Sequence, residues 1–436
     1  MKLILGEETV IVQGMTPEEN PWGKYQFPRP YHLGDRIVVS VHVEEDNTYK
    51  AGVPCRWFES RDNGKSWKEI PPSSAPECGL LLPNGDRYYL PIESGITLDG
   101  YKQTSVRYRT PDYDMEKPAE EGTLPIFDGF TSYFTGATIF AYRADRMPPS
   151  LRASEWKVER IPAGSKEVVK ETAKVDWKAL TRVVMHAPGK VNEPGILKPI
   201  NPRGNLKLGP DGAIWVSAFS GEGHINPENG EYSPYYSAEI FRSSDNGKSF
   251  EHRAHMEYPA DGKEYPYNSG GFSDSDFEFM PDGSIVWFMR SSWMGYTGKE
   301  WAPMYWTRST DGGHTWSKPE KFAPVGILPR LCTLGNGVTL LCYARPGHYV
   351  HACLNESGTK WSEPLVVMKP GDRSKMANHD IETPIWFEWE GACGNPELLA
   401  ISDTEALLFY GDFYYPDEKG IKRKTILCRK ITVVKD

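Results

Sequence analysis

The sequence predicts an all-β fold built from repeated four-stranded antiparallel sheets, and three features of its 436 residues support this prediction. An eight-residue turn motif recurs in near-identical copies, and a second kind of hairpin turn recurs upstream of it. Its 41 glycines and 36 prolines are spread along the chain, which indicates many turns rather than one disordered segment. Such self-similarity is typical of folds that repeat one supersecondary unit.

The eight-residue turn follows a strand-like segment and reads S-x-D-x-G-x-x-[WF]. Its copies are residues 60–67, 243–250 and 309–316, and a worn copy at 355–361 lacks the aspartate. In a tight turn an Asp side chain accepts backbone N–H bonds, and Gly adopts a conformation that other residues resist. Because this role is local, we assign Asp62, Asp245 and Asp311 to structure and not to catalysis.

The second repeat is an apolar strand, a turn with Gly or Asp, and another apolar strand, which is a β-hairpin pattern. Its six copies lie at residues 30–35, 80–86, 206–212, 277–283, 331–337 and 398–403. Six hairpins predict a six-bladed β-propeller with four-stranded antiparallel blades, and a closed propeller of this length can form a single domain, 1–436.

Two parts of the chain need separate interpretation. An insertion or long loops are expected around residues 116–200, where 166–174 is typical of an exposed excursion or short helix; a seventh blade in this stretch is the alternative. The N-terminal segment 3–13 is expected to close the ring by joining the last blade.

Composition excludes several classes of protein. The formal net charge of −9 lacks the basic footprint of nucleic-acid binding and disfavours an anionic membrane surface, and no apolar stretch is long enough to span a bilayer. Acidic residues come too early for a secretory signal, so we expect a cytoplasmic protein, or a secreted or periplasmic one if a signal was removed. The seven cysteines lack a C-x-x-C pair, so free thiols are expected, and neither a metal nor a cofactor is indicated.

The first strand of each propeller blade lines the axis, so residues that start these strands converge on one funnel. They are polar or ionisable at each of the six hairpins: Arg29, Glu77, Arg203, Asn205, Asp274, Asp276, Arg330, Asn395 and Glu397. Acids and arginines that gather in a concave place indicate a binding site, while salt bridges between blades are the structural alternative.

The repeated turns resemble the Asp-boxes, or BNR repeats, of the sialidase superfamily, in which they join outer strands of propeller blades. The resemblance covers nearly the whole chain and implies carbohydrate processing at the central funnel. It implies that Glu44, Glu45 or Asp46 is the acid, of which Asp46 is preferred. It also implies that Asp274 stands for the family glutamate, and that Arg290 and Arg345 match two carboxylate-binding arginines. Gln26 occupies the place of the first arginine, for which Arg29 is the expected substitute, and the nucleophilic tyrosine has no clear match.

Together these observations predict an exo-acting, sialidase-like glycoside hydrolase for a terminal acidic sugar, sialic or uronic. The candidate catalytic residues are Asp46, Asp274, Asp276 and Glu397, because paired carboxylates cleave glycosidic bonds. The candidate substrate-binding residues are Arg29, Glu77, Arg290, Arg330, Arg345 and Tyr349, because arginines bind carboxylates through forked hydrogen bonds.

Two other functions stay open. Residues 347–351, with His348, Tyr349 and His351, have the residue types of a polysaccharide lyase that removes the C5 proton of a uronate. A carbohydrate-binding propeller without enzyme activity would use the chain's aromatic side chains instead.

Overall fold

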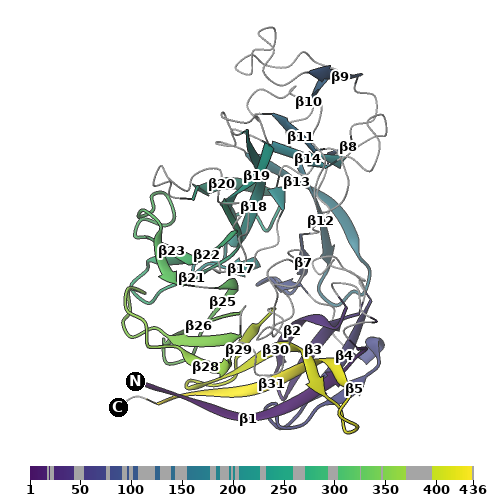
Figure 1. Ribbon diagram of the computed structural model, residues 1–436, viewed down its shortest axis with the longest axis vertical. Coiled ribbons are helices and arrows are strands. Elements are labelled where there is room, and N and C mark those ends of the chain that lie inside the picture. The colour runs from purple at the N-terminus through teal and green to yellow at the C-terminus, as the bar shows by residue number, and fades with distance from the viewer. Residues whose placement is uncertain are drawn as a thin grey trace. The chain divides into compact units, whose positions relative to one another are not determined.

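The computed structural model describes residues 1–16, 19, 24–43, 54–74, 79–90, 96–97, 102–106, 123–127, 139–142, 155–176, 183–186, 196–197, 200–201, 206–225, 232–258, 271–292, 303–324, 326–344, 347–369 and 395–434. Within these residues the chain is all-β, in agreement with the predicted fold class, and its helical structure is limited to 3₁₀ geometry, as in the turn Pro72–Ser74 (Figure 1). The chain divides into two compact units, and the boundary within β21 falls between Asp274 and Ser275.

The first unit contains residues 1–79, 275–290 and 296–436, and most of its strands form three four-stranded antiparallel sheets. These three sheets are β2 (Gln26–Leu33), β3 (Arg36–His42), β4 (Cys55–Ser60) and β5 (Lys68–Ile70); β25 (Ile327–Thr333), β26 (Thr339–Ala344), β27 (His348–Ala352) and β28 (Leu365–Met368); and β29 (Glu397–Ala400), β30 (Glu405–Pro416), β31 (Lys422–Val434) and β1 (Lys2–Gln13). The strands β21 (Gly271–Phe279), β22 (Ile285–Ser292), β23 (Met304–Ser309) and β24 (Glu320–Ala323) pair in that order at one end of a larger, 13-stranded sheet, and β21 and β22 each belong partly to the second unit.

The first strand of the chain completes the last sheet. β1 pairs antiparallel with β31 from Lys2 opposite Val434 to Gln13 opposite Thr425, and the two strands run side by side in Figure 1. The prediction that the N-terminal segment joins the last sheet is therefore confirmed.

Neighbouring sheets of this unit pack face to face through alternating side chains. On β30, Leu408 and Tyr410 pack in the core shared with β25–β28, whereas Leu407 and Phe409 pack in the core shared with β2–β5. Successive residues of a strand point to opposite faces, so this sheet is buried on both sides. All four side chains are at most 1% exposed, and each contributes about 1.5–3 kcal/mol of hydrophobic stabilisation.

The second unit contains residues 80–274 and 291–295. Its longer strands are β6 (Leu80–Leu81), β7 (Arg87–Tyr89), β12 (Glu155–Ile161) and β13 (Val169–Asp176), paired in that order, and β17 (Leu206–Leu208), β18 (Ile214–Ile225), β19 (Tyr232–Ser243) and β20 (Ser249–Met256), also paired in that order. Its shorter strands are β8 (Ile96–Thr97), β9 (Lys102–Val106), β10 (Thr123–Phe127), β11 (Ile139–Tyr142), β14 (Val183–His186), β15 (Ile196–Leu197) and β16 (Ile200–Asn201). β13 and β20 pair in parallel, which joins the two sets into one sheet.

All six hairpins predicted from the sequence form. They connect β2 to β3, β6 to β7, β17 to β18, β21 to β22, β25 to β26 and β29 to β30. The turns are closed by backbone hydrogen bonds such as Gly283 N to Met280 O at 2.9 Å and Gly337 N to Leu334 O at 2.9 Å. A closed ring of six blades remains a prediction.

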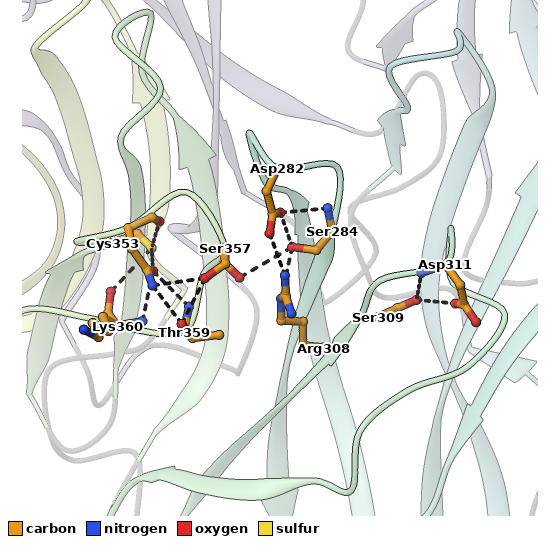
Figure 2. Close-up of polar contacts among 10 residues, drawn as sticks. Asp282, Ser284, Arg308, Ser309, Asp311, Cys353, Ser357, Thr359 and Lys360 are labelled. Atoms are coloured by element: carbon orange, nitrogen blue, oxygen red, sulfur yellow. Dashed lines mark hydrogen bonds and ion pairs between the residues drawn. The ribbon is translucent and has the colours of Figure 1, made fainter.

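The three aspartates of the repeated turn make the same contacts, as predicted. Asp311 Oδ1 accepts a hydrogen bond of 2.8 Å from Ser309 Oγ (Figure 2). It also accepts hydrogen bonds from the backbone N–H groups of His314 and Thr315, at 3.0 and 2.9 Å. Asp62 and Asp245 bind their own turns in the same manner. Each turn joins the third and fourth strands of its set, so these carboxylates are committed to local structure.

The worn copy uses an amide where the others use a carboxylate. Asn355 Oδ1 accepts backbone N–H bonds from Thr359 and Lys360, both at 3.1 Å, while Cys353 takes the place that serine has two residues earlier in the other turns (Figure 2 shows Cys353, Thr359 and Lys360). Trp361 Nε1 donates to Gly358 O, as Trp316 Nε1 donates to Gly313 O. The copy therefore contains one additional residue and keeps the turn's hydrogen bonds without aspartate.

One expectation for the insertion is wrong. The sequence predicts an exposed excursion or a short helix at residues 166–174. The short helix is wrong, because residues 169–176 form strand β13, which pairs with β12 and β20. Alternation decides the matter: Ala173 and Val175 are buried and Lys174 is exposed, the period of a strand.

Two further observations concern the described residues. Five cysteines lie among them, and none of these five is in a disulfide: Cys55, Cys332, Cys342, Cys353 and Cys428. No helix in this part of the chain is long and apolar enough to span a membrane.

Candidate functional site

Three charged side chains from three sheets meet in the first unit. Arg29 Nη1 lies 3.0 Å and Arg330 Nε 3.3 Å from the same atom, Oε2 of Glu397. Arg330 Nη1 also donates to its own neighbour's carbonyl, Pro329 O, at 3.1 Å. The side chains of Arg29 and Glu397 are 18% and 14% exposed, so this cluster is partly accessible to a ligand.

The three residues occupy equivalent places at the start of their strands. Each directly follows a proline, in Phe27-Pro28-Arg29, Leu328-Pro329-Arg330 and Asn395-Pro396-Glu397. Proline fixes its own backbone and cannot donate to the sheet, so it is suited to the first residues of a strand.

Irregular backbone precedes both arginines. The pairing of β2 with β3 shifts register between Gln26 and Arg29, and Phe27 has a φ of 51°. The pairing of β25 with β26 shifts in the same way before Arg330, and Leu328 has a φ of 48°. A positive φ is rare outside glycine, and bulges that re-aim side chains are frequent beside active sites.

A buried aspartate holds the start of β25. Asp276 is fully buried, and its Oδ2 accepts a 2.8 Å hydrogen bond from the backbone N–H of Leu331, next to Arg330. Behind the cluster, burial raises the pKa of the Cys342 thiol well above its usual value, and the negative charge of Glu397 adds to this effect. Cys342 therefore stays a neutral thiol and is unsuited to act as a nucleophile.

A neutral pair lies beside the charged cluster. Asn395 Nδ2 donates a 2.9 Å hydrogen bond to Gln26 Oε1, and the two residues are 5% and 1% exposed. Gln26 starts β2 and Asn395 precedes β29 by two residues, so this pair joins the same two strands as Arg29 and Glu397. In the described part of the chain, Gln26 Nε2 and Asn395 Oδ1 have no hydrogen-bond partner.

The structure thus brings together Arg29, Arg330 and Glu397. Asp276 is close to them, because it accepts a hydrogen bond from the backbone N–H of Leu331, the residue after Arg330. Arg290 ends the pairing of β22, opposite Met304, and Asp274 is 8% exposed on the part of β21 that belongs to the second unit. Asp46, Glu77, Arg203, Asn205 and Arg345 lie outside the described residues, as do Glu44 and Glu45.

The residues suggested for a lyase are part of the packing on β27, the third strand of its sheet. Tyr349 stacks on Tyr343 with ring centroids 5.2 Å apart, and Tyr343 Oη bonds His351 Nε2 at 3.1 Å. His351 Nδ1 donates to Ser362 O at 2.7 Å, and burial lowers the pKa of His351. His348 is 1% exposed and bonds Gly411 O. These contacts hold the three side chains against neighbouring strands and against the segment that follows β27.

A second group of ionisable side chains lies on β19 and β20, in the second unit. Glu239 is fully buried, and its two oxygens bind His252 Nε2 at 2.7 Å and His255 Nδ1 at 2.8 Å. His255 Nε2 also bonds Glu257 Oε1 at 3.1 Å. Burial opposes the charge of Glu239, but the neighbouring His255 and His252 outweigh it and lower its pKa to about 2. Across the described residues, no group of three or more His, Cys, Asp or Glu has the geometry to hold a metal ion.

Comparison with known proteins places the chain by its fold. No protein-family model and no curated protein matches the sequence. A protein of unknown function from Dyadobacter fermentans is similar over 99% of both chains, with 17% identity and a TM-score of 0.55. An α-L-arabinanase from Penicillium chrysogenum matches over 97% of this chain and 98% of its own, with 12% identity and a TM-score of 0.44. A Trypanosoma rangeli sialidase matches over 94% of this chain and 55% of its own, with 10% identity and a TM-score of 0.41.

These similarities concern the course of the chain. An intramolecular trans-sialidase from Ruminococcus gnavus is also among the structures found, with 14% identity and a TM-score of 0.41. A fold of this kind hosts different chemistries, so function has to be argued from the side chains.

Proposed function

We propose that this protein is a glycoside hydrolase with a six-bladed propeller fold, exo-acting on a glycan that ends in an acidic sugar. The observation that carries the proposal is the convergence of Arg29 and Arg330 on Glu397, from three different sheets. In a propeller these strand starts belong to the inner strands, so the cluster would face the central funnel.

The charge of the cluster supports an anionic ligand. Two guanidinium groups share one carboxylate oxygen, so the three side chains carry more positive than negative charge. Arginine recognises carboxylates through two parallel hydrogen bonds, and a sialic or uronic acid supplies such a group. Arg290 and Arg345 are proposed to contribute to the same recognition, with Glu77 and Tyr349 as further contacts.

Glu397 is the carboxylate that a substrate can reach. Its side chain is 14% exposed, whereas Asp276 is fully buried and bonded to backbone. Hydrolysis of a glycosidic bond uses two carboxyl groups, one of which protonates the leaving oxygen while the other acts as base or nucleophile. We propose Glu397 as one of them and Asp46 as the candidate for the other, while a catalytic role for Asp274 and Asp276 stays a prediction from the sequence.

A panel of aryl glycosides tests this function. Sialosides, glucuronides, galacturonides, arabinofuranosides and galactosides are incubated with the protein, and uronate polysaccharides are assayed beside them. Release of the aryl group or of reducing sugar without an unsaturated product supports hydrolysis. An absorbing unsaturated product would identify a lyase instead, and ligand binding without turnover of any substrate would identify a carbohydrate-binding protein.

A further inference from the structure

The Gln26–Asn395 pair is bonded through only one hydrogen bond. Two carboxamides that face each other can form two, since each has an oxygen acceptor and an NH₂ donor. Here Asn395 Nδ2 donates to Gln26 Oε1, and Gln26 Nε2 and Asn395 Oδ1 are left without a partner among the described residues. The two amides therefore have one unused donor, Gln26 Nε2, and one unused acceptor, Asn395 Oδ1, beside their shared hydrogen bond.

This result does not depend on which way the amides are turned. If both groups are rotated by half a turn, Gln26 Nε2 donates to Asn395 Oδ1, and the unused atoms become an acceptor on Gln26 and a donor on Asn395. One donor and one acceptor remain in both cases. Buried polar atoms in native proteins are nearly always bonded, so such a pair is a place for a ligand group or a bound water.

We propose that Gln26 and Asn395 determine substrate specificity by binding a sugar hydroxyl, which donates one hydrogen bond and accepts another. The inference rests on the proposed function, since it places this hydroxyl on the same sugar that meets Arg29 and Arg330. The pair is uncharged and does not favour a carboxylate, whereas the arginines do. The substrate is therefore an acidic sugar with an unsubstituted hydroxyl close to its carboxylate.

The location of the pair supports this assignment. Gln26 and Arg29 lie on β2, Asn395 and Glu397 lie at the start of β29, and both pairs connect these two strands. The amides are more buried than Arg29 and Glu397, so the bound hydroxyl lies deeper than the charged group. The terminal torsion of an amide side chain is soft, which allows both groups to turn towards the ligand.

Binding measured apart from catalysis tests the proposal. D-glucuronic acid, D-galacturonic acid, N-acetylneuraminic acid, D-galactose and L-arabinose are titrated into the wild-type protein and into Gln26→Glu and Asn395→Asp variants by calorimetry. Gln26→Glu still accepts from Asn395 Nδ2 but has no donor to offer, so we expect the best-bound acidic sugar to bind at least tenfold more weakly. Asn395→Asp leaves a carboxylate that only accepts hydrogen bonds, so this variant should weaken binding as well. Lys65→Gln, on a distant exposed turn, is the control and should bind like wild type.

A second measurement needs no variant. Monodeoxy derivatives of the best-bound sugar are titrated into the wild-type protein, and we expect the loss of one particular hydroxyl to weaken binding at least tenfold. Equal affinities across this series, or binding by folded Gln26→Glu protein that equals wild type, would mean that the pair holds only a water and would overturn the proposal. If none of the sugars binds to the wild-type protein, the proposal is overturned too. Binding with these effects but without hydrolysis would instead reject the glycosidase function and keep the binding site.

Discussion

Arg29 and Arg330 donate to one and the same oxygen atom, Oε2 of Glu397, at 3.0 and 3.3 Å. The two arginines belong to different sheets and each follows a proline after a residue with positive φ. The positive φ angles of Phe27 and Leu328 each cost about 1–3 kcal/mol relative to regular strand backbone. That the same irregularity occurs twice, both times just before an arginine of the cluster, indicates that it serves to aim these side chains.

The repeated turns should be separable from activity. Asp245→Ala removes the acceptor of two backbone N–H groups and two hydroxyls, so we expect a fall of about 1–3 kcal/mol in the free energy of unfolding and unchanged activity per folded molecule. Chemical denaturation and the glycoside assay measure the two quantities. Asn355→Asp is the matched variant: it restores the residue of the other turns and should change stability by less than about 1 kcal/mol. Loss of activity in folded Asp245→Ala would contradict the structural assignment.

Gly247 should tolerate no side chain, because a Cβ there would lie 2.3 Å from Tyr88 Cε2. Gly212 is a matched control in the same unit: its φ of 77° is close to the 82° of Gly247, but a Cβ would meet nothing within 4 Å. Alanine at Gly212 should cost about 1–2 kcal/mol for the left-handed backbone alone, and alanine at Gly247 about 1–3 kcal/mol more. Equal losses in denaturant unfolding would show that the contact with Tyr88 is unimportant.

Stability should fall in acid because of Glu239. Its pKa is lowered to about 2 in the folded protein from an ordinary value of 4.5, so its contribution is complete above pH of about 4.5 and is lost as the pH falls towards 2. The contribution is on the order of 3 kcal/mol. Unfolding of wild type and Glu239→Gln is followed from pH 6 to pH 2: the wild type should lose more stability than the variant in this window. Parallel curves would disprove the role of this carboxylate.

Ordinary sialidase turnover should be weak or absent. Gln26, at the place of the family's first arginine, is buried and bonded to Asn395, and no tyrosine was matched to the family nucleophile. An aryl sialoside assay against a standard sialidase measures this directly. Turnover at the rate of the standard would show that the catalytic residues were aligned wrongly.

Most of the local architecture followed from the sequence, because it is encoded by local chemistry. Asp62, Asp245 and Asp311 with their glycines define the turns, and the six hairpins follow from apolar strands around Gly, Asn and Asp. The strand at 169–176 was missed as a strand, because its many charged residues obscured a period of two that only Ala173 and Val175 reveal.

The site was predictable in part. Arg29, Arg330 and Glu397 are predictable from their place before a hairpin, and the proline before each of them is a second sequence signal that groups them. Proline also directly precedes two other candidate residues, Glu77 and Arg203. The hydrogen bond between Gln26 and Asn395 joins strands from opposite ends of the chain, so local sequence does not predict it. In the worn turn, one additional residue shifts Asn355 relative to the glycine of the motif, so its match to the aspartate of the other turns is not evident from the sequence.

The most direct test of the account is the activity and stability of Glu397→Gln measured together, with Glu405→Gln as control. Glu405 lies on the same sheet and pairs with Lys430 at 2.8 Å, so its removal costs an ion pair without touching the cluster. If Glu397 is catalytic, hydrolysis of the best aryl glycoside should fall at least about 100-fold while Glu405→Gln retains it. A loss of about 3–5 kcal/mol in stability for Glu397→Gln, with activity per folded molecule retained, would show that Glu397 is only the structural counterion of Arg29 and Arg330 and would contradict the account.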